Sequence, residues 1–392
     1  MARVTGQWVH VQVPGEPFRA FLPHKLPPDP PVRVEAFLPL LGDADRAIGR
    51  LDGICRTLPD SGLFLYMYVR KEAVLSSQIE GTQSSLSDLL RMDEPGANPS
   101  PDSDIGQVSR YVAAMEHGVK RLREDNFPLS LRLIRELHEQ LLQNARGGHL
   151  APGEFRTSQN WVGGSRPGNA LYVPPPPGQL NDLLSDLERF LHAERGLPVL
   201  LKAALVHVQF ESIHPFLDGN GRIGRLLIPF VLCAEGVLRE PLLYPSLFFK
   251  QNRSRYYALL QRVRTDGDWE SWVEFFLTGI RDTAEQAVEA AQQILELLDR
   301  DRQSLEGLGR QRLSALQVHR AVQSHPFFTV PRISRTSGLS YPTVARAIAN
   351  MEGLGMVKRL PFKTGPQIFT YDRYLQILNE GTEPIPESPA TD

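Results

Sequence analysis

The segment HPFLDGNGRIGR at residues 214–225 constrains the fold most, because it sets three glycines and four ionisable side chains between two apolar stretches. Residues 198–213 repeat apolar side chains at helical spacing, and residues 222–236 read as a buried helix. The segment is therefore a loop that ends one helix and begins the next. Its Gly-x-Gly-x-x-Gly letters at 219–224 also occur in dinucleotide-binding turns. Such turns follow a β-strand, whereas a predicted helix precedes this one, so we reject that interpretation.

The start of the second helix is equipped to bind a polyphosphate. Gly219, Asn220 and Gly221 can turn successive backbone N–H groups inward as an anion-binding nest. The helix that begins near Arg222 adds its free N–H groups and its dipole at the same point. Arg222 and Arg225 are three residues apart, so they are neighbours on the first helical turn.

Two further side chains of the loop point to group transfer. Asp218 offers a hard oxygen ligand, which suits Mg²⁺ bridging phosphates. His214 is the group of the loop that can take up a proton near neutral pH. Together with the phosphate grip, they predict phosphoryl or nucleotidyl transfer. The alternative is a polar turn in which Asp218 caps the helix and His214 only packs; it explains each residue singly but not the set.

The loop matches the Fic motif, HPFx[D/E]GNGRxxR, at every specified position, and the chain resembles the Fic family over residues 40–285. The segment GEFRTSQNWVGG at 153–164 belongs to that resemblance. Such a resemblance implies a mostly helical enzyme that transfers AMP from ATP to a Ser, Thr or Tyr hydroxyl of a target protein, releasing pyrophosphate. Other nucleotides or phosphocholine as donors, and the reverse removal of AMP, remain open alternatives.

The resemblance also implies roles for individual residues. His214 would be the general base and Asp218 the Mg²⁺ ligand. Arg222 would lie on the β-phosphate side of the nucleotide and Arg225 at its γ-phosphate. Asn252 and Tyr257, which match the family more weakly, would line the adenine and phosphate pocket. The residues expected to contact the nucleotide are thus Gly219, Asn220, Gly221, Arg222, Gly224, Arg225, Asn252 and Tyr257.

A second segment resembles the flap of the family. Residues 160–173, with Gly163 and Gly164 at the turn, are expected to form a β-hairpin that pairs with the backbone of the target. Two other residues near the loop, Phe216 and His207, are expected to be structural rather than catalytic.

The sequence SSQIEG at 76–81 ends a predicted helix over 63–81. By itself a glutamate at a helix end is most often solvated. Ser76-x-x-x-Glu80-Gly81 nevertheless resembles the inhibitory motif of the family, [S/T]xxxE[G/N]. That resemblance implies an ion pair between Glu80 and Arg225, which would occupy the γ-phosphate grip and leave ATP misaligned.

The C-terminal part is basic, since residues 311–373 hold nine Lys and Arg against two acidic residues in a chain of net charge −2. Its pattern of helix, helix, turn, helix and hairpin predicts a winged helix-turn-helix domain. The expected DNA contacts are on the third helix and the wing: Ser340, Tyr341, Thr343, Arg346, Asn350, Lys358, Arg359 and Lys363. A protein-interaction or dimerisation surface is the alternative. A DNA-binding regulator whose core senses nucleotide is therefore the competing function.

The predicted fold class is mainly α: a Fic-type helical core with a β-hairpin flap, plus the C-terminal winged helix-turn-helix domain. The expected divisions are an N-terminal helical region (1–104), a Fic catalytic core (105–285), a connecting helix (286–310), the winged helix-turn-helix (311–378) and a disordered tail (379–392). Two cysteines, no signal-like N-terminus and no apolar run of ~20 residues lead us to expect a cytoplasmic protein without a membrane segment. The long helix and the winged helix both offer surfaces for a homodimer.

Overall fold

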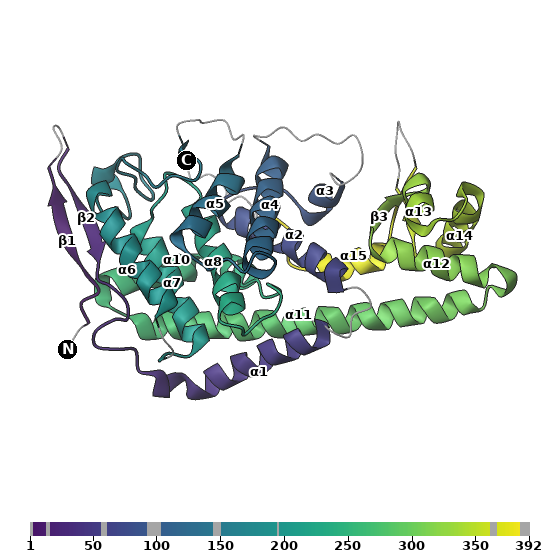
Figure 1. Cartoon of the computed structure of the whole chain (residues 1–392), viewed down its shortest axis with the longest axis horizontal. Helices are drawn as coiled ribbons and strands as arrows, with labels where there is room; N and C mark the ends of the chain where they lie inside the picture. Colours follow the sequence, from purple (N-terminus) through teal and green to yellow (C-terminus); the bar gives the residue numbers. More distant parts are fainter. Residues whose placement is uncertain are drawn as a thin grey trace, which may run out of the picture.

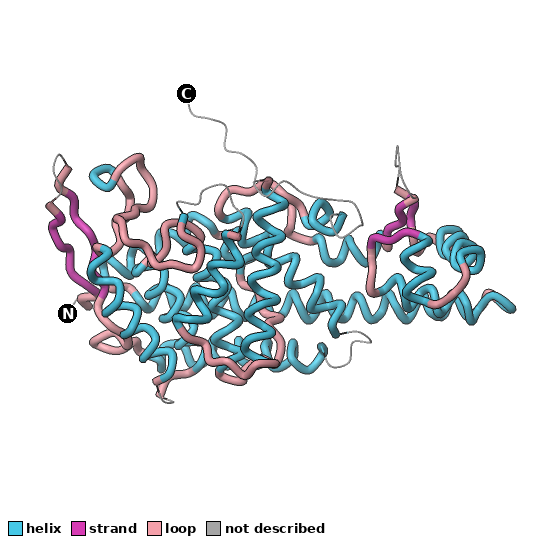
Figure 2. Tube along the Cα trace, turned by 45° about the horizontal axis from the view of Figure 1, so that its top comes forward, coloured by secondary structure: helices cyan, strands magenta, loops and turns pink. Residues whose placement is uncertain are grey.

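The computed structural model describes residues 3–12, 16–55, 61–91, 103–143, 150–193, 196–360 and 367–384. Within these ranges the chain is mainly helical, which confirms the mainly α part of the predicted fold class. Figure 1 shows a broad helical body, with a small two-stranded sheet at one end and a smaller module at the other; Figure 2 shows the same layout in a second view. None of the described helices is long and apolar enough to cross a membrane.

The helices of the body are α1 (Leu38–Cys55), α2 (Ser61–Ile79), α3 (Leu86–Arg91), α4 (Asp104–Arg123), α5 (Leu131–Leu142), α6 (Leu180–His192), α7 (Val199–Ile213), α8 (Asn220–Ala234), α9 (Ser246–Gln251), α10 (Arg253–Asp266) and α11 (Trp269–Glu306). Of these, the helices predicted over 63–81, 198–213 and 222–236 are present as α2, α7 and α8, with ends shifted by no more than two residues.

Helix α7 is the centre of the body. Every residue from Leu200 to Ile213 is buried, because α6, α8, α10 and α11 all pack against this helix. A buried helix must satisfy its polar groups within the protein, and Trp272 of α11 donates a hydrogen bond to the backbone oxygen of Ala204 at 3.0 Å. The loop of residues 214–219 connects the end of α7 to the start of α8, so the packing of these two helices fixes both of its ends.

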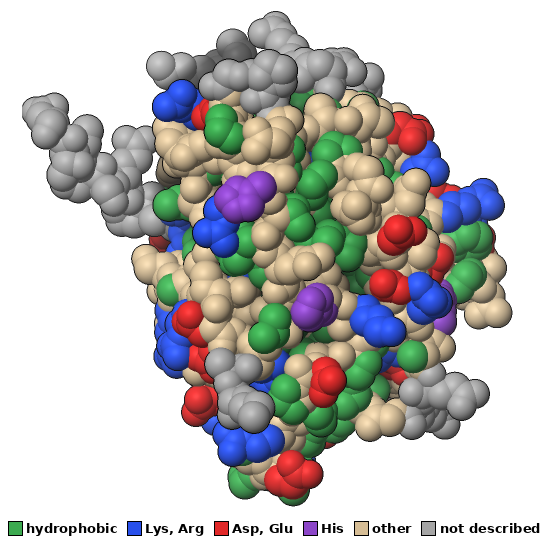
Figure 3. Space-filling view, turned by 90° about the vertical axis from the view of Figure 1, so that its left-hand side faces the viewer, with side chains coloured by type: hydrophobic (Ala, Val, Ile, Leu, Met, Phe, Trp, Pro, Cys, Tyr) green, Lys and Arg blue, Asp and Glu red, His purple; other side chains and the backbone are tan. Residues whose placement is uncertain are grey.

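A β-hairpin that the sequence analysis did not assign precedes the helices. Strands β1 (Gly6–Val11) and β2 (Phe18–Pro23) pair antiparallel at one end of the molecule. The backbone N–H of Phe21 donates to the oxygen of Val173 at 2.9 Å, so β2 also borders the segment expected to be the flap. The end face beside this hairpin carries acidic and basic side chains interspersed with apolar ones (Figure 3).

The last helix of the body corrects one boundary. The sequence divides residues 269–307 into a core helix and a connecting helix, but α11 is a single helix of 38 residues. Its buried face runs from Trp269 to Leu305, because α1 packs along its first part and α12 and α15 along its last part. Figure 1 shows α11 extending from the body into the C-terminal module.

The C-terminal module has the three helices and the following strand pair that the sequence predicts, and it adds a strand, β3, that was not predicted. It comprises α12 (Arg312–Gln323), β3 (Phe327–Thr329), α13 (Val330–Ser337), α14 (Tyr341–Gly353), β4 (Lys358–Arg359) and β5 (Ile368–Thr370), with the strands in the order β3-β5-β4. The tip of the hairpin, including Lys363, lies outside the described residues.

The chain then returns to the body, which the sequence analysis did not expect. Helix α15 (Asp372–Asn379) packs against α11 and α2. Beyond it, Thr382 is buried and its backbone oxygen accepts a hydrogen bond from Gln78 of α2 at 2.9 Å. The expectation of a disordered tail from residue 379 is therefore wrong as far as residue 384, and residues 385–392 lie outside the described part.

Candidate active site

The loop between α7 and α8 is shaped by its own backbone and by one side-chain clasp. His214 ends α7 in the left-handed conformation, with φ of 50°, and Gly219 begins α8 with φ of 77°. The amide of Asn220 accepts from the N–H of Phe216 and donates to its carbonyl, each at 2.9 Å. The ring of Phe216 is buried and stacks on His138 at 3.7 Å. Asn220 thus fixes the loop through its side chain, and Phe216 anchors it, as expected.

Three buried residues outside the loop hold its backbone. Arg156 donates through Nε to the oxygen of His214 at 2.9 Å, and Asn160 donates to the oxygen of Phe216 at 2.7 Å. His138 lies 3.1 Å from the oxygen of Asp218, and burial lowers the pKa of its imidazole to about 4. Sequence reasoning missed these supports, although two of them lie in the GEFRTSQN segment that it had noted.

The His214 ring is neutral at physiological pH. Burial lowers its pKa to about 3, and the charges of Arg264 and Arg156 add to that effect. Within the described residues, Nδ1 has no hydrogen-bond partner, and it lies 3.9 Å from a carboxylate oxygen of Glu211. Burial raises the pKa of Glu211 to about 7. A neutral imidazole keeps a lone pair free, so His214 can accept a proton.

The end of α2 reaches the first turn of α8. Nη2 of Arg225 donates to Glu80 at 2.7 Å and to the backbone oxygen of Ser76 at 2.9 Å, while Nε donates to the Ser76 hydroxyl at 2.9 Å. Gly81, with φ of 108°, follows the last turn of α2. A Cβ added to Gly221 would lie 2.2 Å from a carboxylate oxygen of Glu80, so this carboxylate sits directly on the first residues of α8. It occupies the place where a helix N-terminus binds an anion.

The two charges of this pair stabilise each other. Arg225 is 1% exposed and Glu80 is 38% exposed. Burial alone would lower the pKa of Arg225, but the charge of Glu80 together with Tyr256, Tyr257 and Glu211 raises this pKa above its ordinary value. Burial would raise the pKa of Glu80, yet the attraction of Arg225 holds it below its ordinary value. Both groups are therefore ionised at neutral pH.

Arg222 and Asp218 form the outer edge of the loop. Nη2 of Arg222 lies 3.3 Å from the Asp218 carboxylate, whose side chain is 52% exposed. Nε of Arg222 is buried and has no hydrogen-bond partner in the described part of the chain. No cluster of three acidic, His or Cys side chains suited to a metal occurs among the described residues. A lone exposed carboxylate nevertheless fits Mg²⁺, which commonly takes one or two carboxylates, waters and substrate phosphates.

The expected flap differs from a hairpin. Between residues 160 and 173, one antiparallel bridge, Val162 with Tyr172, closes a loop. Gly163 and Gly164 have φ of 70° and 71°. Such positive angles break an extended strand, and the proline at 167 has no N–H for a ladder, so pairing stops after one bridge.

Of the weaker matches, the structure brings one close to the loop. Tyr257 is 38% exposed, and burial together with the Glu80 charge raises the pKa of its hydroxyl to about 12. Asn252 instead donates to the oxygen of Phe248 at 3.0 Å, within the end of α9, and no described contact joins its side chain to the loop.

His207 of α7 and Gly224 of α8 lie at the contact between these two helices. His207 is fully buried, with Nδ1 2.9 Å from the oxygen of Gly224 and Nε2 2.8 Å from the Tyr256 hydroxyl, as expected for a structural residue. A Cβ at Gly224 would lie 2.4 Å from a Glu211 carboxylate oxygen. Gly224 thus permits close packing of the two helices.

Comparisons with known proteins agree with this arrangement. Residues 38–120 match the family model described as Fic/DOC family N-terminal, and residues 128–232 match the model described as Fic/DOC family. Protein adenylyltransferase Fic of Culex quinquefasciatus is 38% identical over 170 residues, covering 42% of this chain and 30% of that protein. Protein adenylyltransferase Fic of Drosophila melanogaster is 34% identical over 241 residues, covering 59% of this chain and 44% of that protein. The chain thus spans less than half the length of these relatives.

Two solved structures share the fold. A Fic family protein from Desulfovibrio desulfuricans G20 aligns with a TM-score of 0.55 at 21% identity, over 85% of this chain and 96% of that chain. A Fic domain containing signaling protein from Bacteroides thetaiotaomicron aligns with a TM-score of 0.53 at 22% identity, over 64% of this chain and 97% of that chain.

Proposed function

This chain belongs to the Fic/DOC family, and on that premise we propose that it transfers AMP from ATP to a hydroxyl side chain of a target protein. One observation carries the proposal: the loop and the first turns of α8 carry a neutral histidine and a buried arginine, and Glu80, which follows α2, pairs with that arginine. Such a loop can bind a polyphosphate and also accept a proton, which are the two requirements of nucleotidyl transfer.

The reaction exchanges one bond at the α-phosphorus of ATP. The target oxygen forms a bond to this phosphorus, the bond to the bridging oxygen of the β-phosphate breaks, and pyrophosphate leaves. The hydroxyl proton passes to a ring nitrogen of His214, which is neutral and therefore free to take it. Rigid support of the loop by Arg156 and Asn160 keeps the ring in position, because transfer depends on the alignment of the reacting atoms.

The phosphates would lie at the start of α8. The free N–H groups of Gly221 and its neighbours, with the guanidiniums of Arg222 and Arg225, would hold the β- and γ-phosphates. Mg²⁺ held through Asp218 would neutralise part of the phosphate charge. Tyr257, at the rim, is the proposed adenine-side contact, and the loop at 160–173 is the proposed docking edge for the target backbone.

We propose that Glu80 inhibits the enzyme. Its carboxylate already bonds Arg225 and covers Gly221, so a γ-phosphate would compete with it for the same donors. Ser76 holds the guanidinium through its hydroxyl and its carbonyl, which keeps Arg225 directed at Glu80. ATP bound with a displaced γ-phosphate would have its α-phosphorus out of line for attack.

The test is autolabelling with ATP radiolabelled at the α-phosphate, in Mg²⁺. We expect weak labelling of the wild type, strong labelling of Glu80→Gly, and loss of that labelling when His214→Ala is added. The matched control is Glu306→Gly: Glu306 also ends a helix, is 46% exposed and pairs with Arg302 at 2.8 Å. Equal labelling of wild type and Glu80→Gly would contradict the inhibitory role. No labelling of any variant that still binds ATP would contradict AMP transfer and favour another donor or the reverse reaction.

A second function is favoured by the surface of the C-terminal module. Tyr341 is 56% exposed, and Arg346, Lys358 and Arg359 are exposed too. We propose that this module is a winged helix that contacts DNA phosphates through these residues. Two other expected contacts are less available, because the hydroxyls of Ser340 and Thr343 bond each other at 2.8 Å. Absence of a gel shift at low salt would contradict the DNA proposal.

A further inference from the structure

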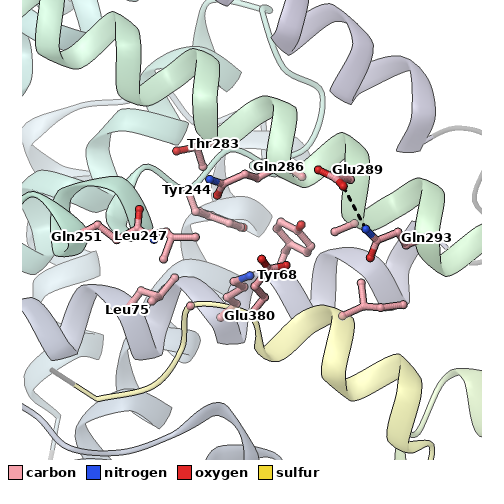
Figure 4. A pocket seen from close by; sticks show the side chains of 15 residues that line it. Tyr68, Leu75, Tyr244, Leu247, Gln251, Thr283, Gln286, Glu289, Gln293 and Glu380 are labelled. Atoms are coloured by element: carbon pink, nitrogen blue, oxygen red, sulfur yellow. Dashed lines mark hydrogen bonds between the residues drawn. The ribbon is translucent and has the colours of Figure 1, made fainter. Parts of the chain in front are cut away.

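A cavity of about 360 Å³ lies behind α2, away from the loop at 214–225. Figure 4 shows its walls: Tyr68 and Leu75 come from α2, Thr283 and Gln286 from α11, and Glu380 from the segment after α15. No residue of the loop lines it. This volume corresponds to roughly a dozen water molecules of ~30 Å³ each. It lies at the small end of the range of ligand-binding pockets.

The cavity holds polar groups that lack partners in the described part of the chain. Thr283 is 8% exposed and its hydroxyl has no hydrogen-bond partner. Lys71 also lines the cavity, and it has no hydrogen bond or ion pair with a described residue. Burial lowers the pKa of Lys71 to about 8, although the charge of Glu380 acts against that shift. Buried polar groups are ordinarily paired, so the Thr283 hydroxyl indicates a site for a ligand, to which the partly buried Lys71 would offer a charged contact.

The charges on the walls narrow the class of ligand. Lys71 would attract an anion, but a simple anion would also face Glu289 and Glu380, which line the same cavity. A simple cation would face Lys71. A molecule with both charges satisfies each wall: a carboxylate beside Lys71, and an ammonium beside Glu380 and the ring of Tyr68, which lies 6.0 Å from the Lys71 nitrogen. Thr283 and Gln286 can bond a neutral polar group.

We propose that this cavity binds a small zwitterion, a free amino acid, and that its occupancy stabilises the inhibited position of Glu80. Helix α2 links the two sites. Tyr68, Lys71 and Leu75 repeat at helical spacing and line the cavity, while Glu72, Ser76 and Glu80 form the neighbouring stripe, of which the last two bind Arg225. A ligand that holds one stripe in place therefore holds the other.

The segment after α15 closes the cavity and is tied to the same helix. Gln78, two residues before Glu80, donates to the oxygen of Thr382 and to that of Ser84, each at 2.9 Å. Lys250 of α9 donates to the oxygen of Gly381 at 3.1 Å. The cavity and the Glu80–Arg225 pair are present together in this structure. A ligand that fits this conformation shifts the population toward it and so reduces AMP transfer. This regulatory step rests on the proposed function, whereas binding does not.

Binding is tested on the full chain with the twenty free L-amino acids at 10 mM, by thermal shift and then calorimetry. We expect at least one to raise Tm by about 2 °C or more, and its N-acetyl and carboxamide derivatives, each lacking one charge, to give no shift. Lys71→Met and Thr283→Val should abolish the shift, while Lys120→Met, at an exposed lysine of α4, should retain it. No shift with any amino acid, or a shift that survives both cavity variants, would overturn the proposal.

The regulatory step is tested by autolabelling with the amino acid that binds. At ten times its Kd, a ligand specific to the inhibited conformation should lower wild-type labelling about tenfold and leave Glu80→Gly unchanged. Equal inhibition of both proteins, or of neither, would overturn the link to Glu80. If Glu80→Gly shows no labelling at all, AMP transfer itself fails, and the binding experiment still decides whether the cavity is a site.

Discussion

Two helices of this protein, α8 and α14, begin after a turn and carry arginines expected to meet phosphates, yet they differ in burial. Arg222 and Arg225 of α8 are 5% and 1% exposed, whereas Arg346 of α14 is exposed. A buried guanidinium needs acceptors fixed by the fold, and for Arg225 these come from α2. A solvated arginine needs none. The carboxylate that pairs with the buried Arg225 therefore indicates where an anion would bind. The exposed Arg346 gives no such indication, so its ligand has to be found by experiment.

The largest expected effect is a difference in AMP-transfer activity between variants of Arg225 and Arg346. In the Glu80→Gly background, Arg225→Met should lower autolabelling by at least about 100-fold, because a buried charged contact to phosphate is lost. Arg346→Met in the same background should change it less than about twofold. Similar losses in both variants would break the comparison and indicate that the C-terminal module takes part in transfer.

Stability should separate the same two residues. Arg225→Met should lower the free energy of unfolding by about 3 kcal/mol, since Ser76 loses two donors inside the core while the half-exposed Glu80 regains hydration. Arg346→Met should stay within about 0.5 kcal/mol of the wild type. Urea titrations of the two variants measure both values, and equal midpoints would contradict the structural role of Arg225.

The pH dependence of kcat/KM sharpens the account of the buried site. Because burial lowers the pKa of His214 to about 3, its ring is neutral throughout the range from pH 7 to about 5. The kcat/KM of the Glu80→Gly variant should therefore stay constant over that range. An exposed histidine base would lose activity near pH 6.5. Glu211 titrates near pH 7, so Glu211→Gln is the control that identifies any inflection belonging to that carboxyl. A loss near pH 6.5 in both proteins would contradict the low pKa of His214.

The smallest effect concerns the exposed basic surface. If the module meets DNA phosphates, Lys358→Met should weaken binding by a similar factor on every sequence and reduce the slope of log K against log salt by about 1. Gel shifts at several salt concentrations measure this slope. An unchanged slope would remove Lys358 from the interface.

Local patterns in the sequence were sufficient for much of the site. The loop and the helices on each side follow from glycine spacing and apolar periodicity, and the ion pair of Glu80 with Arg225 was expected from the resemblance of the SSQIEG segment to the inhibitory motif of the family. The contacts of Ser76 with Arg225 were not expected. Nor were the supports of the loop. Arg156, Asn160 and His138 act because the fold brings distant segments to the loop, and nothing in their immediate neighbours signals burial.

Three expectations from the sequence were wrong, and each has its own physical reason. A helix boundary at residue 285 was inferred from a change of composition, but α11 continues because both halves have an apolar face and no breaker separates them. The tail was expected to be disordered from residue 379, yet hydrogen bonds from Gln78 and Lys250 hold residues 381 and 382. The single bridge of the expected flap reflects two glycines with positive φ, which side-chain alternation alone does not reveal.

The unbroken α11 also makes the chain sensitive to its own length. At ~1.5 Å and ~100° per residue, 38 residues give a rod of about 57 Å whose far end has a fixed rotational phase. One residue inserted near its middle would swing the C-terminal module through about 100° and carry α15 away from α2. An insertion of seven would restore the phase to within about 20° but move the module by about 10 Å. The length of this helix can therefore change only if the contact of α15 with α2 is rebuilt.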